Sequence, residues 1–350
     1  MRKSVLGLVV IALTMLLAGC GPSESETKDY ALMNQIPLTV ECVGHMRIGL
    51  PEKGVKSWSA TVDGADLKRL KGLSKDAFMD YVQARKNEVA ALPHHSEANR
   101  LVAFRTFGES GAILLYREDA FQTEVVEMDR YFWVEGGQGS GTGYYLDSGS
   151  HFGQVEEDLA RFARIFSQFS TRQPGDESAS GGFCIDGASL TSDDVGVATD
   201  VTVSVPGQPG WDLYVSYARL GGGKAVPETE GIDPRLATAV GSMELEQEKY
   251  RKQAQADPDI KQEADYPREF EVLRESRREI GGVKGGEAVW KKELNDGQVL
   301  YTFLWMDEAL TEQSAVVEMN TRQSGEDSSS EERMLALWDA VLTSAKFQLY

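Results

Sequence analysis

Residues able to perform covalent or metal chemistry are few and scattered in this chain of 350 residues. Serines near glycines include Ser110, Ser140, Ser148 and Ser150. None of them has glycine at both the second position before it and the second position after it, as the nucleophile elbow of α/β-hydrolases requires. His94 and His95 are adjacent but have no carboxylate or cysteine at metal-ligand spacing. The glycine-rich stretch EGGQGSGTGYY, residues 135–145, matches no phosphate-binding loop. We therefore expect no catalytic residue, no metal site and no cofactor, and we predict that the chain is not an enzyme.

The amino terminus has the pattern of a cleaved secretion signal. Arg2 and Lys3 precede an apolar run, residues 5–17, which is too short to span a bilayer. The run ends in Leu-Ala-Gly-Cys at positions 17–20, and this matches the lipobox of bacterial lipoproteins. We interpret residues 1–19 as a signal peptide and Cys20 as the lipid attachment site. The alternatives are an ordinary signal peptide with a chance cysteine and an uncleaved anchor.

The residues behind this cysteine are predicted to form a tether. Residues 20–36 are polar and lack periodicity, so they should behave as a flexible chain spanning about 20 Å. Gly21, rather than aspartate, follows the cysteine, which by resemblance to other lipoproteins indicates passage to the outer membrane. We therefore expect a body that faces the periplasm and is held at the membrane by lipid.

Composition indicates a folded but strongly acidic body. Hydrophobic residues make up 41% of the chain and aromatic residues 9%, which is enough to build cores. The chain has 36 basic and 55 acidic residues, and removing Arg2 and Lys3 with the signal leaves 34 against 55, a balance of −21. Such a charge repels nucleic acid and anionic lipid. A protein partner of basic or mixed charge fits this body, and general solubility explains the charge equally well.

The body divides into two halves with the same order of strands and helices. We predict an N-terminal domain at residues 37–172 and a C-terminal domain at residues 183–350. Between them, residues 173–182 are rich in glycine, serine and charge, as in an interdomain linker. Both domains are expected to be α+β, each an antiparallel sheet with packed helices, and a duplication would explain the repeated order.

Hydrophobic spacing gives the elements of the first half. Residues 38–52 are predicted to form one strand, with Cys42 and Met46 on its apolar face and Glu41 and His45 opposite. A helix capped by Ser74 is expected to run through Ala91. An antiparallel meander and a closing amphipathic helix follow, at residues 101–147 and 154–169.

The second half is predicted to begin with two paired strands. Val201 and Val203 in one strand should share a core face with Leu213 and Val215 in the next. A long helical segment follows from about Pro234 and becomes almost wholly polar at residues 244–265. Further strands are expected at residues 287–294, 298–306 and 314–320. A last helix begins with the capping box of Ser329 and Glu332 and should bury Met334, Trp338, Val341 and Ala345.

Two cysteines remain after lipidation, and their state is left open by the sequence. Cys42 and Cys184 lie near the starts of the two halves, and in an oxidising periplasm such a pair often forms a disulfide. Closing so long a loop would stabilise the fold by about 5 kcal/mol in the chain-entropy model. Cys42 also lies on the apolar face of its strand, where a buried free thiol is ordinary.

The openings of the two halves resemble a known family. The stretch ECVGHMRIGLPE at residues 41–52 and the stretch GFCIDGASLTSDD at residues 182–194 are similar to the two domain starts of class-four type VI lipase immunity proteins, the Tli family. In that family Gly-Arg and an aromatic residue more often stand where this chain has Gly44, His45 and Met46. The resemblance implies a periplasmic protein of two α+β domains that binds a phospholipase effector and blocks it, without being an enzyme.

Two surfaces are predicted to contact such a partner. The glycine-rich stretch ends in Tyr144 and Tyr145, and aromatic residues exposed on a loop make good anchors. An acidic stretch, which should steer association, contains Asp257, Asp259, Glu263 and Asp265. A turn and a solvated helix are the alternatives for these two segments.

A different class of function also fits the sequence. An envelope lipoprotein that binds a small ligand or assists assembly of a surface complex would need the same anchor and the same absence of catalytic groups. The genomic neighbourhood separates these possibilities, because an immunity gene should lie beside a gene for a lipase with the G-x-S-x-G motif.

Overall fold

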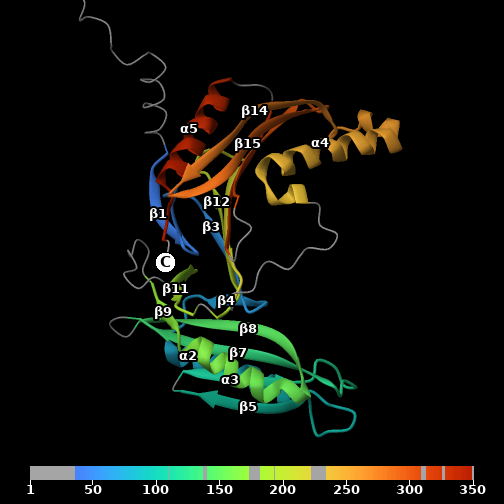
Figure 1. Cartoon of the computed structure of the whole chain (residues 1–350). Coiled ribbons are helices and arrows are strands. Elements are labelled where there is room, and N and C mark those ends of the chain that lie inside the picture. Colours follow the sequence, from blue (N-terminus) through green and yellow to red (C-terminus); the bar gives the residue numbers. More distant parts are fainter. Residues whose placement is uncertain are drawn as a thin grey trace, which may run out of the picture.

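The chain forms two lobes, an upper and a lower one, in the computed structural model (Figure 1). Antiparallel strands run through both of them. The structure describes residues 36–108, 110–136, 140–172, 182–192, 194–221, 234–308, 313–324 and 328–348. The predicted signal peptide, Cys20, the predicted tether up to residue 35 and residues 173–181 of the predicted linker lie outside this part of the chain.

The upper lobe in Figure 1 contains the sheet order β14-β15-β16-β17-β13-β12-β3. These strands are β3 (Lys56–Val62), β12 (Val197–Ser204), β13 (Trp211–Arg219), β14 (Pro267–Ile280), β15 (Val283–Leu294), β16 (Gln298–Asp307) and β17 (Gln313–Ser324). Phe303 of β16 packs on Trp338 of α5 (Ser328–Ser344), whereas the next residue, Leu304, joins a cluster with Met243 of α4 (Ala239–Ala256). Because successive strand residues point to opposite faces, the two helices cover opposite faces of this sheet.

The lower lobe contains the predicted meander, β5 (Leu101–Phe107), β6 (Gly111–Tyr116), β7 (Val125–Glu135) and β8 (Gly141–His151). Its helices are α2 (Lys75–Ala90) and α3 (Val155–Phe166). Tyr131 and Trp133 pack with Phe78 of α2, while the intervening Phe132 stacks on Phe166 of α3 with ring centroids 4.3 Å apart. The two helices therefore cover opposite faces of this sheet too.

Strand β4 (Ala65–Leu70) joins the two sheets. Its first residues, Ala65 and Asp66, pair with β3 in the upper lobe. Its last residues, 67–70, pair with β8 in the lower lobe. The turn before it is formed by Asp63 and Gly64, both with positive φ, which is the geometry that an Asp-Gly hairpin supplies. One short strand thus carries the chain from one lobe into the other.

Two smaller sheets lie near this joint. One contains β1 (Leu38–Val43), β2 (Met46–Pro51) and the C-terminal β18 (Lys346–Phe347). The other contains β9 (Phe169–Thr171), β10 (Phe183–Ile185) and β11 (Ala188–Leu190). Short 3₁₀ helices complete the described elements: η2 (Phe152–Gln154), η3 (Pro234–Ala237) and η4 (Pro258–Gln262).

Residues 38–52 form a hairpin, so the prediction of one strand is wrong. Gly44, with φ +61°, and His45 make a tight turn, and Val43 pairs directly with Met46. The turn reverses the chain and places the predicted exposed side chains of Glu41 and His45 in buried positions. Gly-His is not among the strong hairpin dipeptides, so the sequence alone gave little sign of this turn.

Several packing predictions are confirmed by the structure. Ser74 caps α2, because its hydroxyl accepts a hydrogen bond from the Ala77 N–H at 3.2 Å. Val201 pairs with Val215 and Val203 with Leu213, and all four side chains are buried. The residues of the last predicted helix that were expected in the core are buried, namely Met334, Trp338, Val341 and Ala345. The side chain of Ser329, half of the predicted capping box, lies outside the described part.

The α+β class is confirmed, but the lobes do not follow the two chain ranges. Strands β1–β3 come from the first half, yet β3 pairs with β12 and β2 pairs with β18 in the upper lobe. The predicted duplication is not confirmed, because the described upper sheet has a different strand order and more strands than the lower one. Strand β14 was not predicted at all. It is a sheet edge with mostly charged side chains, a composition that hides the strand pattern in the sequence.

Candidate protein-binding surface

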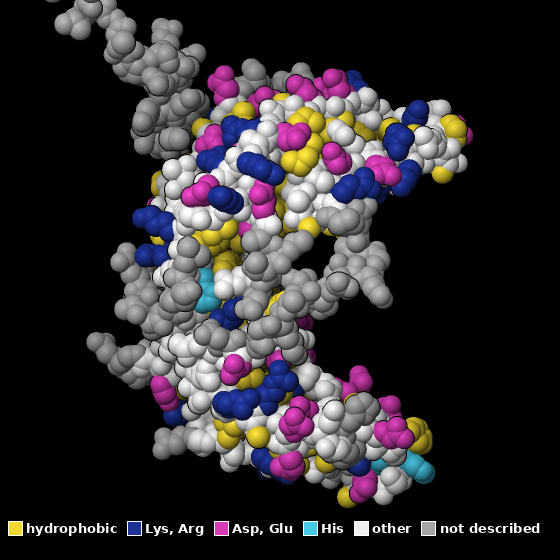
Figure 2. All heavy atoms as spheres, in the orientation of Figure 1, with side chains coloured by type: hydrophobic (Ala, Val, Ile, Leu, Met, Phe, Trp, Pro, Cys, Tyr) yellow, Lys and Arg dark blue, Asp and Glu magenta, His cyan; other side chains and the backbone are white. Residues whose placement is uncertain are grey.

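A groove lies at the joint between the lobes, where the molecule is hollowed in a space-filling view (Figure 2). It consists of two cavities of about 480 and 560 Å³ that share Trp58 of β3, Arg69 of β4 and Asp186 of the β10–β11 turn. Arg69 Nη1 lies 2.7 Å from Asp186 Oδ1, so this ion pair connects β4 with the turn. Sequence analysis did not identify these residues, although the alternating stretch before Asp63-Gly64 signals a strand around Trp58.

The groove carries both signs of charge, and most of its charged side chains are paired. Its basic residues are Lys56, Lys68, Arg69, Lys71 and Arg172, and its acidic residues are Glu41, Asp66, Asp186 and Asp200. Lys56 pairs with Glu41, and Lys71 adds a second cation to Asp186 at 3.7 Å. Within this strongly acidic chain, such a wall is suited to a polar protein surface of mixed charge, because paired charges provide hydrogen bonds without a strong net field.

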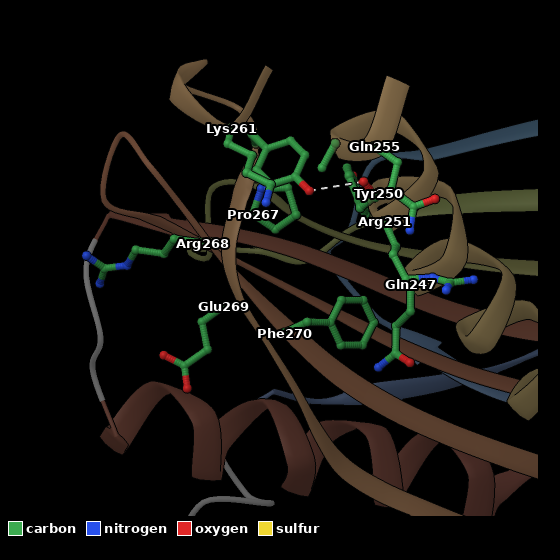
Figure 3. Close-up of a pocket in the computed structure, with 11 residues that line it drawn as sticks. Gln247, Tyr250, Arg251, Gln255, Lys261, Pro267, Arg268, Glu269 and Phe270 are labelled. Carbon is green, nitrogen blue, oxygen red and sulfur yellow. Dashed lines mark hydrogen bonds between the residues drawn. The ribbon is translucent and has the colours of Figure 1, made fainter. Parts of the chain in front are cut away.

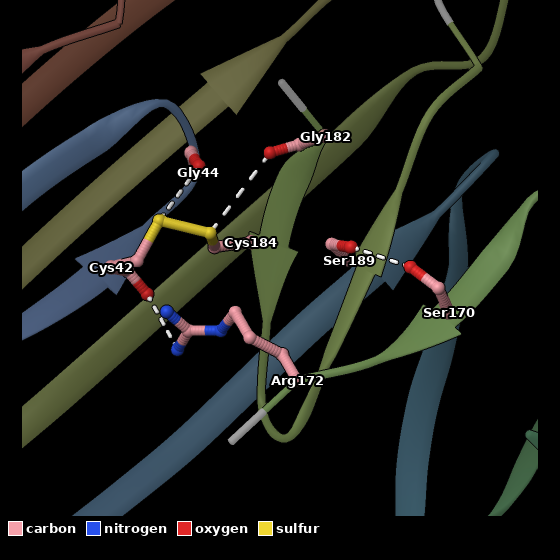
Figure 4. The surroundings of a disulfide bond; sticks show 7 residues. All are labelled: Cys42, Gly44, Ser170, Arg172, Gly182, Cys184 and Ser189. Atoms are coloured by element: carbon pink, nitrogen blue, oxygen red, sulfur yellow. Dashed lines mark hydrogen bonds between the residues drawn. A yellow bond between two sulfur atoms is a disulfide. The ribbon is translucent and has the colours of Figure 1, made fainter. Parts of the chain in front are cut away.

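A disulfide fastens the small β9–β11 sheet to the first hairpin (Figure 4). Cys42 Sγ and Cys184 Sγ are bonded at 2.05 Å, and both side chains are buried. Beside them, the Gly44 N–H donates to the Cys184 carbonyl at 3.0 Å, and the Cys184 N–H donates back to the Gly44 carbonyl at 2.8 Å. Of the two states that the sequence left open, the structure has the disulfide. It connects the upper-lobe hairpin to the strands that line the groove.

Tyr144 is a core residue, which contradicts the expectation of an exposed anchor. The structure begins β8 at Gly141, so both predicted tyrosines are strand residues and point to opposite faces. Tyr144 is 0% exposed, and its hydroxyl donates to the Asp186 carbonyl at 2.7 Å. Burial raises the pKa of its hydroxyl. Tyr144 therefore supports Asp186 of the groove from inside the core, and its ring is not exposed for contact with a partner.

Tyr145 is half-buried and belongs to a hydrogen-bonded cluster around Asp129. The Asp129 carboxylate is fully buried and accepts from the hydroxyls of Tyr145 at 2.9 Å, Tyr116 at 3.2 Å and Tyr131 at 3.2 Å. Arg85 of α2 donates to the same carboxylate at 3.2 Å. Burial, with the nearby Asp129 charge, raises the pKa of Tyr116 to about 12. This cluster fixes α2 on the sheet, and the Tyr145 hydroxyl is one of the groups that stabilise it.

The acidic stretch lies at the outer end of α4 and is exposed. The four predicted side chains, Asp257, Asp259, Glu263 and Asp265, all face solvent. Asp257 caps η4, because its carboxylate accepts from the Asp259 N–H at 3.0 Å. In Figure 1 this end of α4 projects from the upper lobe, so the acidic stretch is accessible to a large partner.

A further cavity of about 480 Å³ lies between α4 and β14 (Figure 3). Its aromatic side chains are Tyr250, Tyr266 and Phe270, and Figure 3 shows the Phe270 ring pointing toward α4. The Tyr266 hydroxyl donates to the Tyr250 carbonyl at 3.0 Å and closes one end. Arg251 and Lys261 add positive charge beside the acidic stretch, so this end of the upper lobe also carries both signs of charge.

In the described part of the chain, no group of three or more histidine, cysteine, aspartate or glutamate side chains could hold a metal ion. Among the same residues, no helix has the length and apolar character needed to cross a bilayer.

Comparison with known proteins identifies the C-terminal part of the chain. Residues 226–349 match the family described as "Tle cognate immunity protein 4 C-terminal domain". Over these residues the chain is similar to the Tli4 C-terminal domain. The match agrees with the family predicted from the two domain openings, which lie outside residues 226–349. The Tli4 C-terminal domain includes α4, β14–β17 and α5, and therefore the edge strand and the projecting helix of the upper lobe.

Solved structures extend the likeness to nearly the whole chain. The apo structure of the immunity protein TplEi of the type VI secretion system from Pseudomonas aeruginosa has a TM-score of 0.67 at 18% identity, covering 90% of this chain and 98% of that chain. The crystal structure of a Tle4-Tli4 complex also has a TM-score of 0.67 at 18% identity, covering 89% and 97%. TplEi complexed with "L" peptide has a TM-score of 0.64 at 18% identity, covering 89% and 98%. At this identity the likeness establishes the fold. No curated protein sequence matches the chain.

Proposed function

We propose that this protein is an immunity protein that binds a type VI secreted phospholipase effector and prevents it from hydrolysing phospholipid. The observation that carries the proposal is the Tli4 C-terminal domain at residues 226–349. The fold of the whole chain supports it, because a protein of the same fold was crystallised in a Tle4-Tli4 complex.

The two lobes provide a physical route to inhibition by binding. Each lobe presents its own surface, and the joint with Trp58, Arg69 and Asp186 lies between them. Two modest contacts that are joined in one chain act together, so their combined affinity exceeds that of either by about 10²–10⁴. Inhibition of this kind requires no catalytic residue, and we propose that the protein has no enzymatic activity of its own.

The proposal is tested with the purified body, residues 21–350, and the lipase encoded beside its gene. Calorimetry should give a tight complex, and the body should prevent release of fatty acid from phospholipid vesicles. Alone, it should release none after repurification. Lack of a complex with that lipase, or hydrolysis by the body itself, would contradict the proposal.

The acidic stretch is proposed to steer the encounter with the lipase. Neutralising Asp257, Asp259, Glu263 and Asp265 together should therefore slow association with the lipase and make the association rate less dependent on salt concentration.

We further propose that Cys20 carries a lipid and holds the protein in the periplasm at the outer membrane. The lipobox at residues 17–20 and Gly21 support this location. Replacing Cys20 by alanine should move the protein from the membrane fraction to the soluble periplasmic fraction, because the acidic body is not attracted to anionic lipid. Immunoblots of both fractions measure this change. An unchanged membrane fraction in the Cys20→Ala strain would show that something other than this lipid anchors the chain.

A further inference from the structure

The free end of the lower lobe presents one strongly exposed aromatic ring. Phe121 lies in the loop between β6 and β7 and is 73% exposed. Water contact with so large an apolar side chain is unfavourable, and an aromatic ring gains most when a partner covers it. Tyr81 is the other large aromatic among the exposed described residues, at 44%, and its ring contacts Tyr131 in the lobe.

The loop that carries Phe121 is held in one shape by hydrogen bonds. The Asp119 carboxylate accepts from the N–H groups of Phe121 at 2.6 Å and Gln122 at 2.9 Å. The Gln122 side chain accepts from the Glu118 N–H at 2.6 Å. The loop therefore needs little ordering when it binds, which lowers the entropic cost of association.

A second loop, which follows α2, supports the first. The His95 N–H donates to the Ala120 carbonyl at 2.9 Å, and the His95 ring lies 5.4 Å from the Phe121 ring, centroid to centroid. His94 is buried, its Nδ1 accepts from the Ser96 N–H, and its Nε2 lies 3.2 Å from the Gln122 carbonyl. Because Nδ1 is an acceptor, Nε2 must carry the proton and donate to Gln122. The adjacent histidines of the sequence thus have a role in presenting Phe121.

The two loops carry several acidic side chains, while their arginines are held against the lobe. Glu97, Glu118, Asp119 and Glu124 are exposed. Arg117 is only 12% exposed and pairs with Glu97 at 3.8 Å, and the Arg100 guanidinium donates to the Pro93 and Glu118 carbonyls. A partner that receives Phe121 must therefore offer an apolar pocket, and positive charge at its rim would complement the carboxylates.

This end of the lower lobe lies on the side toward which α4 projects from the upper lobe. In Figure 1 the teal loops at the right of the lower lobe and the outer end of α4 border the same open side. Figure 2 shows hydrophobic and histidine side chains together at this end of the lower lobe. An object held between the lobes would meet both ends.

From these contacts we infer that Phe121 is an anchor that inserts into an apolar pocket with a basic rim on the phospholipase effector. The inference rests on the proposed function and adds to it a named contact and the chemistry of the partner's pocket. It locates the aromatic anchor in the loop of residues 117–124, whereas the sequence predicted the anchors at Tyr144 and Tyr145 of β8.

The test is the affinity of the full body, residues 21–350, for the lipase encoded beside its gene. Phe121→Ala should weaken binding about 30-fold or more, since truncation of an anchor residue at an interface costs about 2 kcal/mol or more. Val55→Ala is the matched control, because Val55 is 79% exposed in the upper lobe and away from this loop. It should change the dissociation constant less than about twofold. Thermal unfolding of both variants should match the unchanged protein, since both side chains are exposed.

The outcomes separate this inference from the function itself. If the unchanged body binds the lipase and Phe121→Ala binds it equally well, the anchor is wrong and the function stands. If the unchanged body does not bind the lipase, both are wrong. Flotation with phosphatidylethanolamine–phosphatidylglycerol vesicles tests the other partner class. Loss of vesicle binding in Phe121→Ala with unchanged lipase affinity would assign the ring to the membrane and overturn the inference.

Discussion

Replacing Cys42 and Cys184 together by alanine is expected to lower the free energy of unfolding by about 2–5 kcal/mol. The bridge closes a loop between residues separated by 142 positions, and without it the unfolded chain regains the freedom of that loop. The native state also loses the fastening between the β1–β2 hairpin and β10, where two backbone hydrogen bonds remain. Alanine is preferred to serine, because a hydroxyl at these buried positions would need a new partner.

Urea unfolding followed by tryptophan fluorescence measures this change. The unchanged protein supplies its own control, since a reductant should bring its unfolding midpoint close to that of the variant. The variant itself should be insensitive to reductant. The expectation fails if oxidised and reduced protein unfold at the same urea concentration, because the loop constraint would then contribute nothing.

Replacing Glu287 by alanine is expected to cost about 3–5 kcal/mol of stability, as for other buried ion pairs that lose one partner. Glu287 in β15 is 1% exposed, and its carboxylate accepts from Trp338 Nε1 at 2.7 Å and from Arg274 at 3.0 Å. The Ser276 hydroxyl and Arg278 also donate to it. Without this acceptor, the indole N–H of Trp338 is left buried and unpaired beneath α5.

Two control variants make the measurement specific. Glu308 pairs with Arg277 at 3.2 Å, but the Arg277 side chain is 89% exposed, so Glu308→Ala should change stability by about 0.5 kcal/mol or less. Glu287→Gln keeps the shape and one acceptor oxygen and should lie between the two, because Arg274 and Arg278 still pair with Asp339. An alanine variant at Glu287 as stable as the Glu308 variant would refute the role of this buried carboxylate.

Short-range patterns determined much of the secondary structure. The meander of the lower lobe, the cap of α2 at Ser74 and the pairing of Val201 and Val203 with β13 were predicted from local spacing. These features depend on side-chain periodicity and capping, which lie within a few residues of one another in the chain. The two motifs that resemble the family also predicted the class of partner that we propose, since they are local in the sequence.

The candidate surface was much less predictable. The groove exists because β4 leaves one sheet after two residues and joins another, which brings Trp58 and Arg69 beside a turn more than a hundred residues away. The predicted anchors failed for a related reason. The sequence placed Tyr144 in the meander at residues 101–147, but it did not indicate that this side chain would be buried, and the packing of Phe132 and Phe169 against it decided the question.

The sequence by itself thus determined the α+β class, the α-helices, the strands β5–β8, β12, β13 and β15–β17, and the acidic character of the body. It also showed the resemblance of the two domain openings to a family. The tertiary structure alone decided that β1–β3 belong to the lobe formed by the second half, that Cys42 reaches Cys184, and that Phe121 is more exposed than Tyr81 in the described part of the lower lobe. The physical reason is that strand pairing and burial between distant segments depend on which edges and apolar faces the rest of the fold leaves open. Local composition does not contain that information, because the same alternating stretch is stable in either lobe until its neighbours are placed.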